Sequence, residues 1–122
     1  MTTKSFRIVY AEDDAQVRAG VAQMLVEHGL AVHECTNGEE AAQLCSVFHP
    51  DAVLLDLSMP DVDGCEAARR IRKQGLPTRL VALTGRGDDA LREAARAGFD
   101  EFVRKPSSVS TLLSALRCPA ET

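Results

Sequence analysis

The chain has 122 residues, a length that one ordinary domain fills with little left over. Hydrophobic residues make up 45% and charged residues 26%, which excludes a disordered tail and indicates a globular domain. Asp and Glu outnumber Lys and Arg by 18 to 14, giving a net charge of −4, and aromatics are only 4%, so direct nucleic-acid binding is not expected. We therefore expect one domain over residues 1–122, with a core at about 6–117 and no output domain.

The cysteines and the N-terminus indicate a cytoplasmic protein. The four cysteines are too far apart for a close-paired zinc or redox motif and fit reduced packing residues. The first residues lack the apolar stretch of a signal peptide. The aliphatic runs are far shorter than the ~20 residues that span a bilayer, so membrane insertion is not expected.

Short apolar runs alternate along the chain with segments of helical periodicity, the pattern of repeated βα units around a parallel sheet. Five strands are expected, at Arg7–Ala11, Ala31–Cys35, Ala52–Leu55, Arg79–Leu83 and Glu101–Arg104.

The segments after the strands carry apolar residues at helical spacing. The first such segment has Val17, Val21, Met24 and Leu25, and Gly29 should end its helix. The later helices are expected through Ala41–Phe48, through Ala67–Ile71 toward Gly75, over Asp88–Ala97 and over Ser107–Leu116.

Four of the five strands run into polar residues. In an open parallel sheet, ligands bind beyond the carboxyl ends of the strands, where the loops converge. Because those ends share one edge, their polar side chains should lie close together. The residues at these ends are Glu12-Asp13-Asp14 after the first strand, Asp56 after the third, Thr84 after the fourth and Lys105-Pro106 after the fifth.

Three carboxylates brought together repel one another and call for a cation, and Mg²⁺, which prefers oxygen ligands, suits them best. An ammonium and a hydroxyl opposite them, from Lys105 and Thr84, would suit an incoming phosphoryl group. Asp56 stands alone after the most apolar strand, so it is the natural nucleophile for an aspartyl phosphate, leaving the acidic pair for the metal.

The segment Val53–Gly64, which reads VLLDLSMPDVDG, resembles the phosphoacceptor segment of two-component response regulator receiver domains. The resemblance covers nearly the whole chain. It implies a doubly wound α/β fold with five parallel strands in the flavodoxin-like order 2-1-3-4-5. The other matching positions are the acidic pair Glu12-Asp13, Arg18 in the first helix, Thr84 and the Lys105-Pro106 turn.

The resemblance also implies a signalling role. Asp56 would accept a phosphoryl group from a sensor histidine kinase or a histidine phosphotransfer protein. Only self-phosphorylation and self-dephosphorylation are expected, so the chain would not be an enzyme in its own right. Mg²⁺ would be surrounded by Glu12, Asp13, Asp56 and the backbone carbonyl of Ser58.

A switch is implied as well. Thr84 and Lys105 would hold the phosphoryl oxygens, and Phe102 matches the family's aromatic switch position. The signal would pass through the fourth helix, the fifth strand and the fifth helix to an unknown downstream protein. The domain itself is expected to be a monomer or a weak dimer. The Lys105-Pro106 peptide bond is expected to be cis.

Other interpretations fit the residues taken singly. Asp13 fits a cap of the first helix, Thr84 a cap of the fourth, Lys105 a solvated lysine and Phe102 plain packing. A Mg²⁺-dependent phosphohydrolase is an alternative of another class. Such enzymes have a second aspartate two positions after the nucleophile, whereas here Ser58 stands two positions after Asp56. A scaffold receiver should have lost an acidic, acceptor or lysine position, and none is lost. A receiver excised from a hybrid kinase or a longer regulator stays open.

Overall fold

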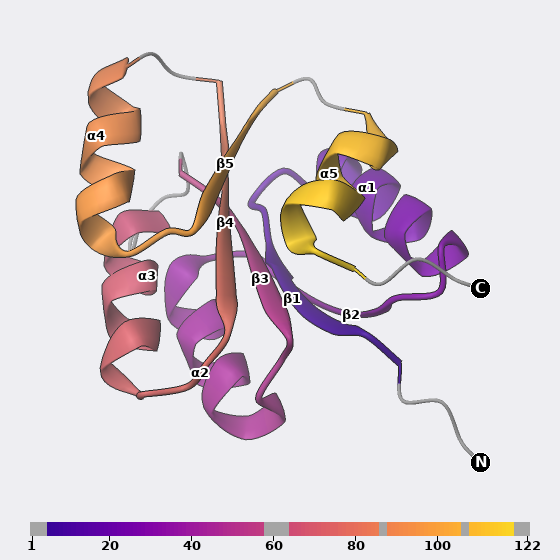
Figure 1. Ribbon diagram of the computed structural model, residues 1–122. Coiled ribbons are helices and arrows are strands. Elements are labelled where there is room, and N and C mark those ends of the chain that lie inside the picture. Colours follow the sequence, from indigo (N-terminus) through magenta and orange to yellow (C-terminus); the bar gives the residue numbers. More distant parts are fainter. Residues whose placement is uncertain (1–4, 58–63, 86–87, 106–107, 119–122) are drawn as a thin grey trace.

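The computed structural model describes residues 5–57, 64–85, 88–105 and 108–118. Five parallel strands form one sheet in the order β2-β1-β3-β4-β5 (Figure 1), which confirms the expected α/β fold and strand order. The strands are β1 (Arg7–Ala11), β2 (Ala31–Cys35), β3 (Ala52–Asp56), β4 (Arg79–Thr84) and β5 (Glu101–Arg104).

A helix follows each strand, and the helices cover both faces of the sheet. Helices α2, α3 and α4 lie on one face, and α1 and α5 lie together on the other (Figure 1). Within the described ranges, no helix combines the length and apolar character needed to cross a bilayer. The helices are α1 (Ala15–Glu27), α2 (Gly38–Phe48), α3 (Gly64–Lys73), α4 (Asp88–Ala97) and α5 (Val109–Leu116).

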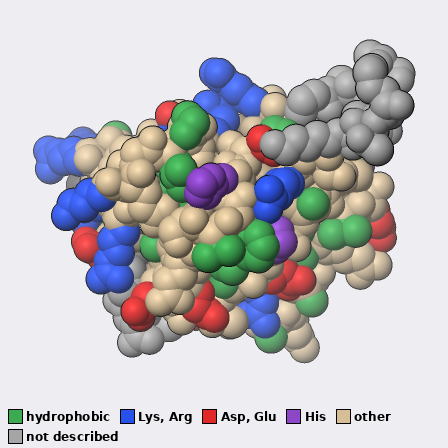
Figure 2. Space-filling view, turned by 90° about the horizontal axis from the view of Figure 1, so that it is seen from below, with side chains coloured by type: hydrophobic (Ala, Val, Ile, Leu, Met, Phe, Trp, Pro, Cys, Tyr) green, Lys and Arg blue, Asp and Glu red, His purple; other side chains and the backbone are tan. Residues whose placement is uncertain are grey.

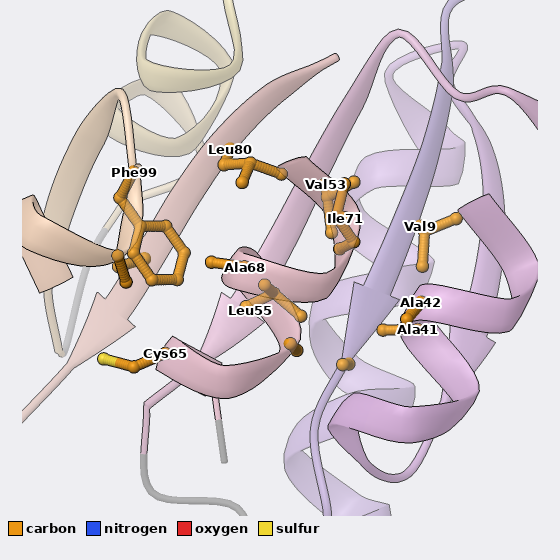
Figure 3. Packing of buried hydrophobic residues seen from close by; sticks show 14 of the residues in the cluster. Val9, Ala41, Ala42, Val53, Leu55, Cys65, Ala68, Ile71, Leu80 and Phe99 are labelled. Atoms are coloured by element: carbon orange, nitrogen blue, oxygen red, sulfur yellow. The ribbon is translucent and has the colours of Figure 1, made fainter. Parts of the chain in front are cut away.

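Alternation along the buried strands builds a separate core on each face. In β1, Val9 packs with α2 and α3, whereas its neighbour Ile8 packs toward α1 and α5. Figure 3 shows the core on the face covered by α2, α3 and α4, in which Ile71 and Phe99 lie against side chains of the sheet. β3 is buried along its whole length, as a central parallel strand covered on both faces must be.

The observed element boundaries differ from the expected ones by one to three residues. β3 and β4 each include one more residue, Asp56 and Thr84, because both still belong to the sheet ladder. The last helix begins at Val109, not Ser107, since the Ser108 side chain accepts a hydrogen bond from the Thr111 amide and caps it.

The helical pattern predicted the buried face of α1 only in part. Leu25 is fully buried, but Val17 is 42% exposed, and the small residue Ala22 is buried instead. Helix α1 shares its face of the sheet with α5, and the residues of its first turn are exposed or only partly buried.

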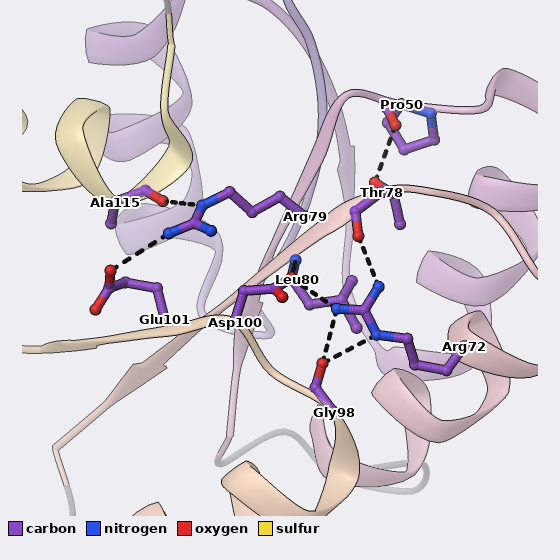
Figure 4. A network of polar contacts seen from close by, with 9 residues as sticks. All are labelled: Pro50, Arg72, Thr78, Arg79, Leu80, Gly98, Asp100, Glu101 and Ala115. Atoms are coloured by element: carbon purple, nitrogen blue, oxygen red, sulfur yellow. Dashed lines mark hydrogen bonds and ion pairs between the residues drawn. The ribbon is translucent and has the colours of Figure 1, made fainter.

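The ends of the strands far from the polar edge are tied by arginine side chains. Arg72 of α3 donates to the carbonyl oxygens of Gly98 and Thr78 and pairs with Asp100 at 2.6 Å (Figure 4). Gly98 has φ +103, which suits glycine and ends α4 as expected. Figure 2 views the molecule from below, and basic, acidic and histidine side chains are interspersed there among hydrophobic ones.

Candidate functional site

The last residue of β3, Asp56, lies at the centre of the polar edge. It is only 2% exposed, and in the sheet register it stands opposite Leu83 of β4. The chain stays in the sheet up to this point, because the amide of Leu57 donates to the carbonyl oxygen of Leu83 at 3.0 Å. The carboxylate is therefore held on rigid backbone.

Two further carboxylates come from the loop that follows β1. One oxygen each of Glu12, Asp13 and Asp56 can be chosen so that all three lie within 4.8 Å of one another. Glu12 is 2% exposed, whereas Asp13 is exposed to solvent. The structure thus brings these three side chains together, as the sequence predicted.

Asp14 caps α1, and Asp13 does not. The Asp14 side chain accepts hydrogen bonds from the amides of Gln16 and Val17. The capping interpretation of Asp13 is therefore wrong, and its carboxylate stays with the acidic group at the end of the sheet.

Lys105, just after β5, lies between two of the carboxylates. Its ammonium nitrogen is 2.6 Å from Asp56 Oδ2 and 3.3 Å from Glu12 Oε1. Its backbone amide donates to the carbonyl oxygen of Thr84 at 2.9 Å, which fixes the start of the loop. The alternative of a merely solvated lysine is wrong, because the side chain is engaged at this site.

Burial and the neighbouring charges shift the pKa values of Glu12 and Lys105. Burial, a hydrogen bond to Asp56 and the Asp56 charge raise the pKa of Glu12 to about 7. Partial burial alone would lower the pKa of Lys105, but its hydrogen bond to Asp56 and the charges of Asp56 and Glu12 raise it instead. The arrangement therefore favours a positively charged group beside Asp56.

The two switch candidates occupy neighbouring strands. Thr84 is the last residue of β4 and is fully buried. It lies four positions before the first residue of α4 and so is not that helix's N-cap. Phe102 of β5 is half-buried and packs against the core beneath α2, α3 and α4, a position that plain packing also explains. Ser58 and Pro106 lie outside the described residues.

Two residues shape the site in ways that sequence reasoning missed. Arg18 donates to the carbonyl oxygen of Glu12 at 2.9 Å and pairs with Glu34 of β2, so it ties the acidic loop to the edge strand. Gly64, the last residue of the segment that resembles the family's phosphoacceptor segment, begins α3 against the end of β3, where a Cβ would lie 2.7 Å from the carbonyl oxygen of Asp56. The family resemblance singled out Arg18 as a matching position but did not predict these contacts.

The donor set suits a hard divalent cation. Carboxylate oxygens are the ligands that Mg²⁺ prefers, and it is commonly held by one or two carboxylates with water or phosphate oxygens completing its coordination. The close approach of Glu12, Asp13 and Asp56 fits that chemistry.

Comparison with known proteins gives a consistent result. The family model described as the response regulator receiver domain matches residues 8–117. PdtaR of Mycobacterium tuberculosis, a transcriptional regulatory protein, is 38% identical over 112 residues, covering 90% of this chain and 54% of its own. The response regulator MprA of Mycolicibacterium vanbaalenii is 36% identical over 112 residues, covering 91% and 48%. The chain thus spans about half the length of these curated relatives.

Solved structures with the same fold include a signal receiver domain and a chemotaxis protein. The receiver domain of a NarL response regulator from M. tuberculosis superposes with a TM-score of 0.84 at 28% identity, covering 96% of this chain and all of that one. The Vibrio cholerae chemotaxis protein CheY4 superposes with a TM-score of 0.88 at 24% identity, covering 93% and 98%, and supports the fold alone. With the strand order, the acidic edge and the family match in agreement, the chain belongs to the response regulator receiver domains of two-component signalling.

Proposed function

We propose that this domain is a phosphorylation-controlled switch in which Asp56 accepts the phosphoryl group. The observation that carries the proposal is the contact of Asp56 with Lys105 at 2.6 Å beside two further carboxylates. A buried carboxylate on a rigid strand end is a suitable nucleophile, and a nearby ammonium can stabilise the negative charge of the transferred group.

The donor would be a phosphohistidine of a sensor kinase or a histidine phosphotransfer protein. A carboxylate oxygen of Asp56 would attack the phosphorus, the phosphorus–nitrogen bond would break, and the imidazole would leave and take up a proton. Mg²⁺, when bound, would supply positive charge opposite the transferred oxygens. Glu12, Asp13 and Asp56 would hold it, together with the proposed backbone carbonyl of Ser58.

Lys105 and Thr84 would then hold the phosphoryl oxygens. Lys105 already donates to Asp56, and Thr84 is buried at the end of the adjacent strand. A shift of Thr84 toward the phosphoryl group would leave room for Phe102 to turn, and α4, β5 and α5 would carry the change to a downstream protein.

Phosphorylation with a small-molecule donor tests the acceptor. Incubation with acetyl phosphate and Mg²⁺ should add one phosphoryl group to the intact protein, and Asp56→Asn should take up none. Asp51→Asn, which changes an exposed aspartate at the other end of β3, is the matched control and should label as the parent does. Labelling of Asp56→Asn at the parent's rate would refute the assignment.

The metal site needs a separate measurement. The double variant Glu12→Gln with Asp13→Asn should lose Mg²⁺-dependent labelling, because two of the three carboxylates are removed. Calorimetric titration of the parent and the double variant should show a clear loss of Mg²⁺ affinity. An unchanged affinity would place the metal elsewhere.

The phosphohydrolase alternative predicts a different result. A phosphohydrolase would turn over p-nitrophenyl phosphate many times with Mg²⁺, whereas an acceptor domain would not sustain release of nitrophenol. Whether the domain belongs to a hybrid kinase or a longer regulator is a separate question, which the adjoining coding sequence answers.

A further inference from the structure

A cavity of about 460 Å³ lies between α1 and α5, on the face of the sheet where these two helices lie side by side. Helix α1 lines it with Val17, Val21 and Met24, and α5 lines it with Leu112. The volume falls in the range of small-molecule sites, and these four side chains are apolar.

The cavity extends from the surface into the core. Val17 at its outer side is 42% exposed, whereas Tyr10 of β1 and Leu83 of β4, which also line it, are 0% and 3% exposed. A molecule that entered past α1 would therefore meet the sheet at the bottom of the cavity.

Tyr10, one of the residues that line this cavity, carries a hydroxyl group in an unusual state. It is buried, and it has no hydrogen-bond partner within the described part of the protein. A buried hydroxyl without a partner is costly, so buried polar groups are nearly always paired. The phenol of a tyrosine is protonated at neutral pH, so this hydroxyl can donate a hydrogen bond.

The charges around the cavity favour a neutral occupant. Lys105 also lines the cavity, but its ammonium already pairs with Asp56 and Glu12. An anionic ligand here would compete with these two carboxylates for one ammonium and be repelled by them. A cationic ligand would have to leave water for a mostly apolar cavity, which is unfavourable.

We propose that the α1–α5 cavity binds a neutral, mainly apolar small molecule whose carbonyl or ether oxygen accepts a hydrogen bond from Tyr10. The apolar walls would bury the body of the ligand, and the Tyr10 hydroxyl would gain the partner that it lacks. Nothing in the proposed phosphoryl chemistry requires this cavity.

Acetophenone and ethylbenzene provide a matched pair of probes, because they differ mainly in the carbonyl oxygen. Titration of the unphosphorylated protein, with the methyl groups of Val, Leu and Met labelled for NMR, should show shifts at Val17, Val21, Met24, Leu83 and Leu112. The methyl groups of Val26 and Val47, which are exposed elsewhere, should not respond.

Tyr10→Phe tests the hydrogen bond while keeping the ring. It should weaken acetophenone binding roughly threefold to tenfold and leave ethylbenzene binding unchanged. Val21→Phe, at a half-buried position, should fill the cavity and abolish the shifts from both probes. Equal effects of Tyr10→Phe on both probes, shifts from Val26 and Val47 as large as those of the lining residues, or no shifts at all would each overturn the proposal. The absence of shifts would favour a groove for a side chain of a protein partner.

An effect on phosphorylation follows from the shared lysine and rests on the proposed function. Since Lys105 lines the cavity and contacts Asp56, a bound molecule should change the rate at which acetyl phosphate labels Asp56. An unchanged rate at saturating acetophenone would overturn this coupling. The binding result does not depend on it, because the titration uses unphosphorylated protein.

Discussion

Gly64 packs so closely against Asp56 that the first residue of α3 can carry no side chain. A Cβ at Gly64 would lie 2.7 Å from the carbonyl oxygen of Asp56 and 3.1 Å from Cα of Leu57. Both neighbours are backbone atoms of the strand end that carries the acceptor carboxylate, so neither can move without moving the site.

Gly64→Ala should therefore destabilise the protein, by about 1 to 3 kcal/mol as overpacking typically does, although alanine is the better helix former. Gly20→Ala in α1 is the matched control, since a Cβ there meets nothing within 4 Å. The control should raise the free energy of unfolding by about 0.5 to 1 kcal/mol. Urea denaturation of the three proteins measures both changes, and equal stabilisation by the two substitutions would contradict the close contact.

Lys105→Met should separate metal binding from phosphoryl transfer. Removal of the ammonium 2.6 Å from Asp56 leaves the carboxylates without a competing cation, so Mg²⁺ affinity should rise roughly threefold to tenfold. Labelling by acetyl phosphate should fall by at least about tenfold, because the group that stabilises the transferred charge is gone. Lys73→Met, at an exposed position at the end of α3, should change neither quantity. A weaker Mg²⁺ affinity in Lys105→Met would argue against this competition.

The raised pKa of Glu12 predicts a pH dependence of stability in protein stripped of metal by EDTA. Its pKa is about 7 in the folded protein, above the ordinary value of 4.5. As the pH rises, the unfolded chain therefore loses the Glu12 proton at a lower pH than the folded protein does. The contribution of this group to the free energy of unfolding is complete below the ordinary pKa of 4.5 and is lost as the pH rises through about 7.

Urea denaturation from about pH 5 to about pH 8 should show stability falling toward high pH, with a slope of at most about 1.4 kcal/mol per pH unit from this group. Glu12→Gln should flatten that fall, and Glu39→Gln, at an exposed position of α2, should follow the parent. A curve for Glu12→Gln parallel to that of the parent would rule out this carboxyl group as the source.

Tyr10→Phe should stabilise the protein by about 1 kcal/mol, because it removes a buried hydroxyl that has no partner among the described residues. Thr78→Val provides the contrast. The Thr78 hydroxyl is also buried but donates to the carbonyl oxygen of Pro50 at 2.9 Å, so its removal should cost about 1 to 2 kcal/mol. Thermal unfolding compares the two, and a destabilised Tyr10→Phe would mean that the hydroxyl is satisfied in solution.

Phe102→Ala should separate phosphorylation from its output. The variant keeps the carboxylates, Thr84 and Lys105, so it should still be labelled, but it lacks the ring proposed to turn. In the parent, a beryllofluoride phosphate mimic should shift amide resonances in α4, β5 and α5, and in Phe102→Ala these shifts should shrink toward the Asp56 pocket. Coupling of this kind is typically about 1 to 3 kcal/mol, or roughly 5- to 150-fold in partner affinity.

Phe48→Ala is the control, since Phe48 stacks on His33 at the end of α2 and has no part in the proposed route. It should keep the parent's response to beryllofluoride. Shifts in the parent that stop at the Asp56 pocket would refute this transmission route while leaving the acceptor assignment intact.

The order of elements was predictable from local sequence. Strands and helices follow from short apolar runs, helical spacing and glycines such as Gly98, whose positive φ ends a helix. The meeting of Glu12, Asp13 and Asp56 was predictable too, because the carboxyl ends of parallel strands share one edge.

Only the tertiary structure decided the contacts that depend on how closely elements approach. Lys105 was expected opposite the carboxylates, but its direct contact with Asp56, 49 positions away along the chain, depends on how closely the two strand ends approach. The close contact of Gly64 depends on where α3 begins against β3. The exposure of Val17 and the cavity beside it likewise depend on the spacing of α1 and α5. Periodicity defines which side of a helix is apolar, but the distance to the neighbouring helix determines how much of that side is covered.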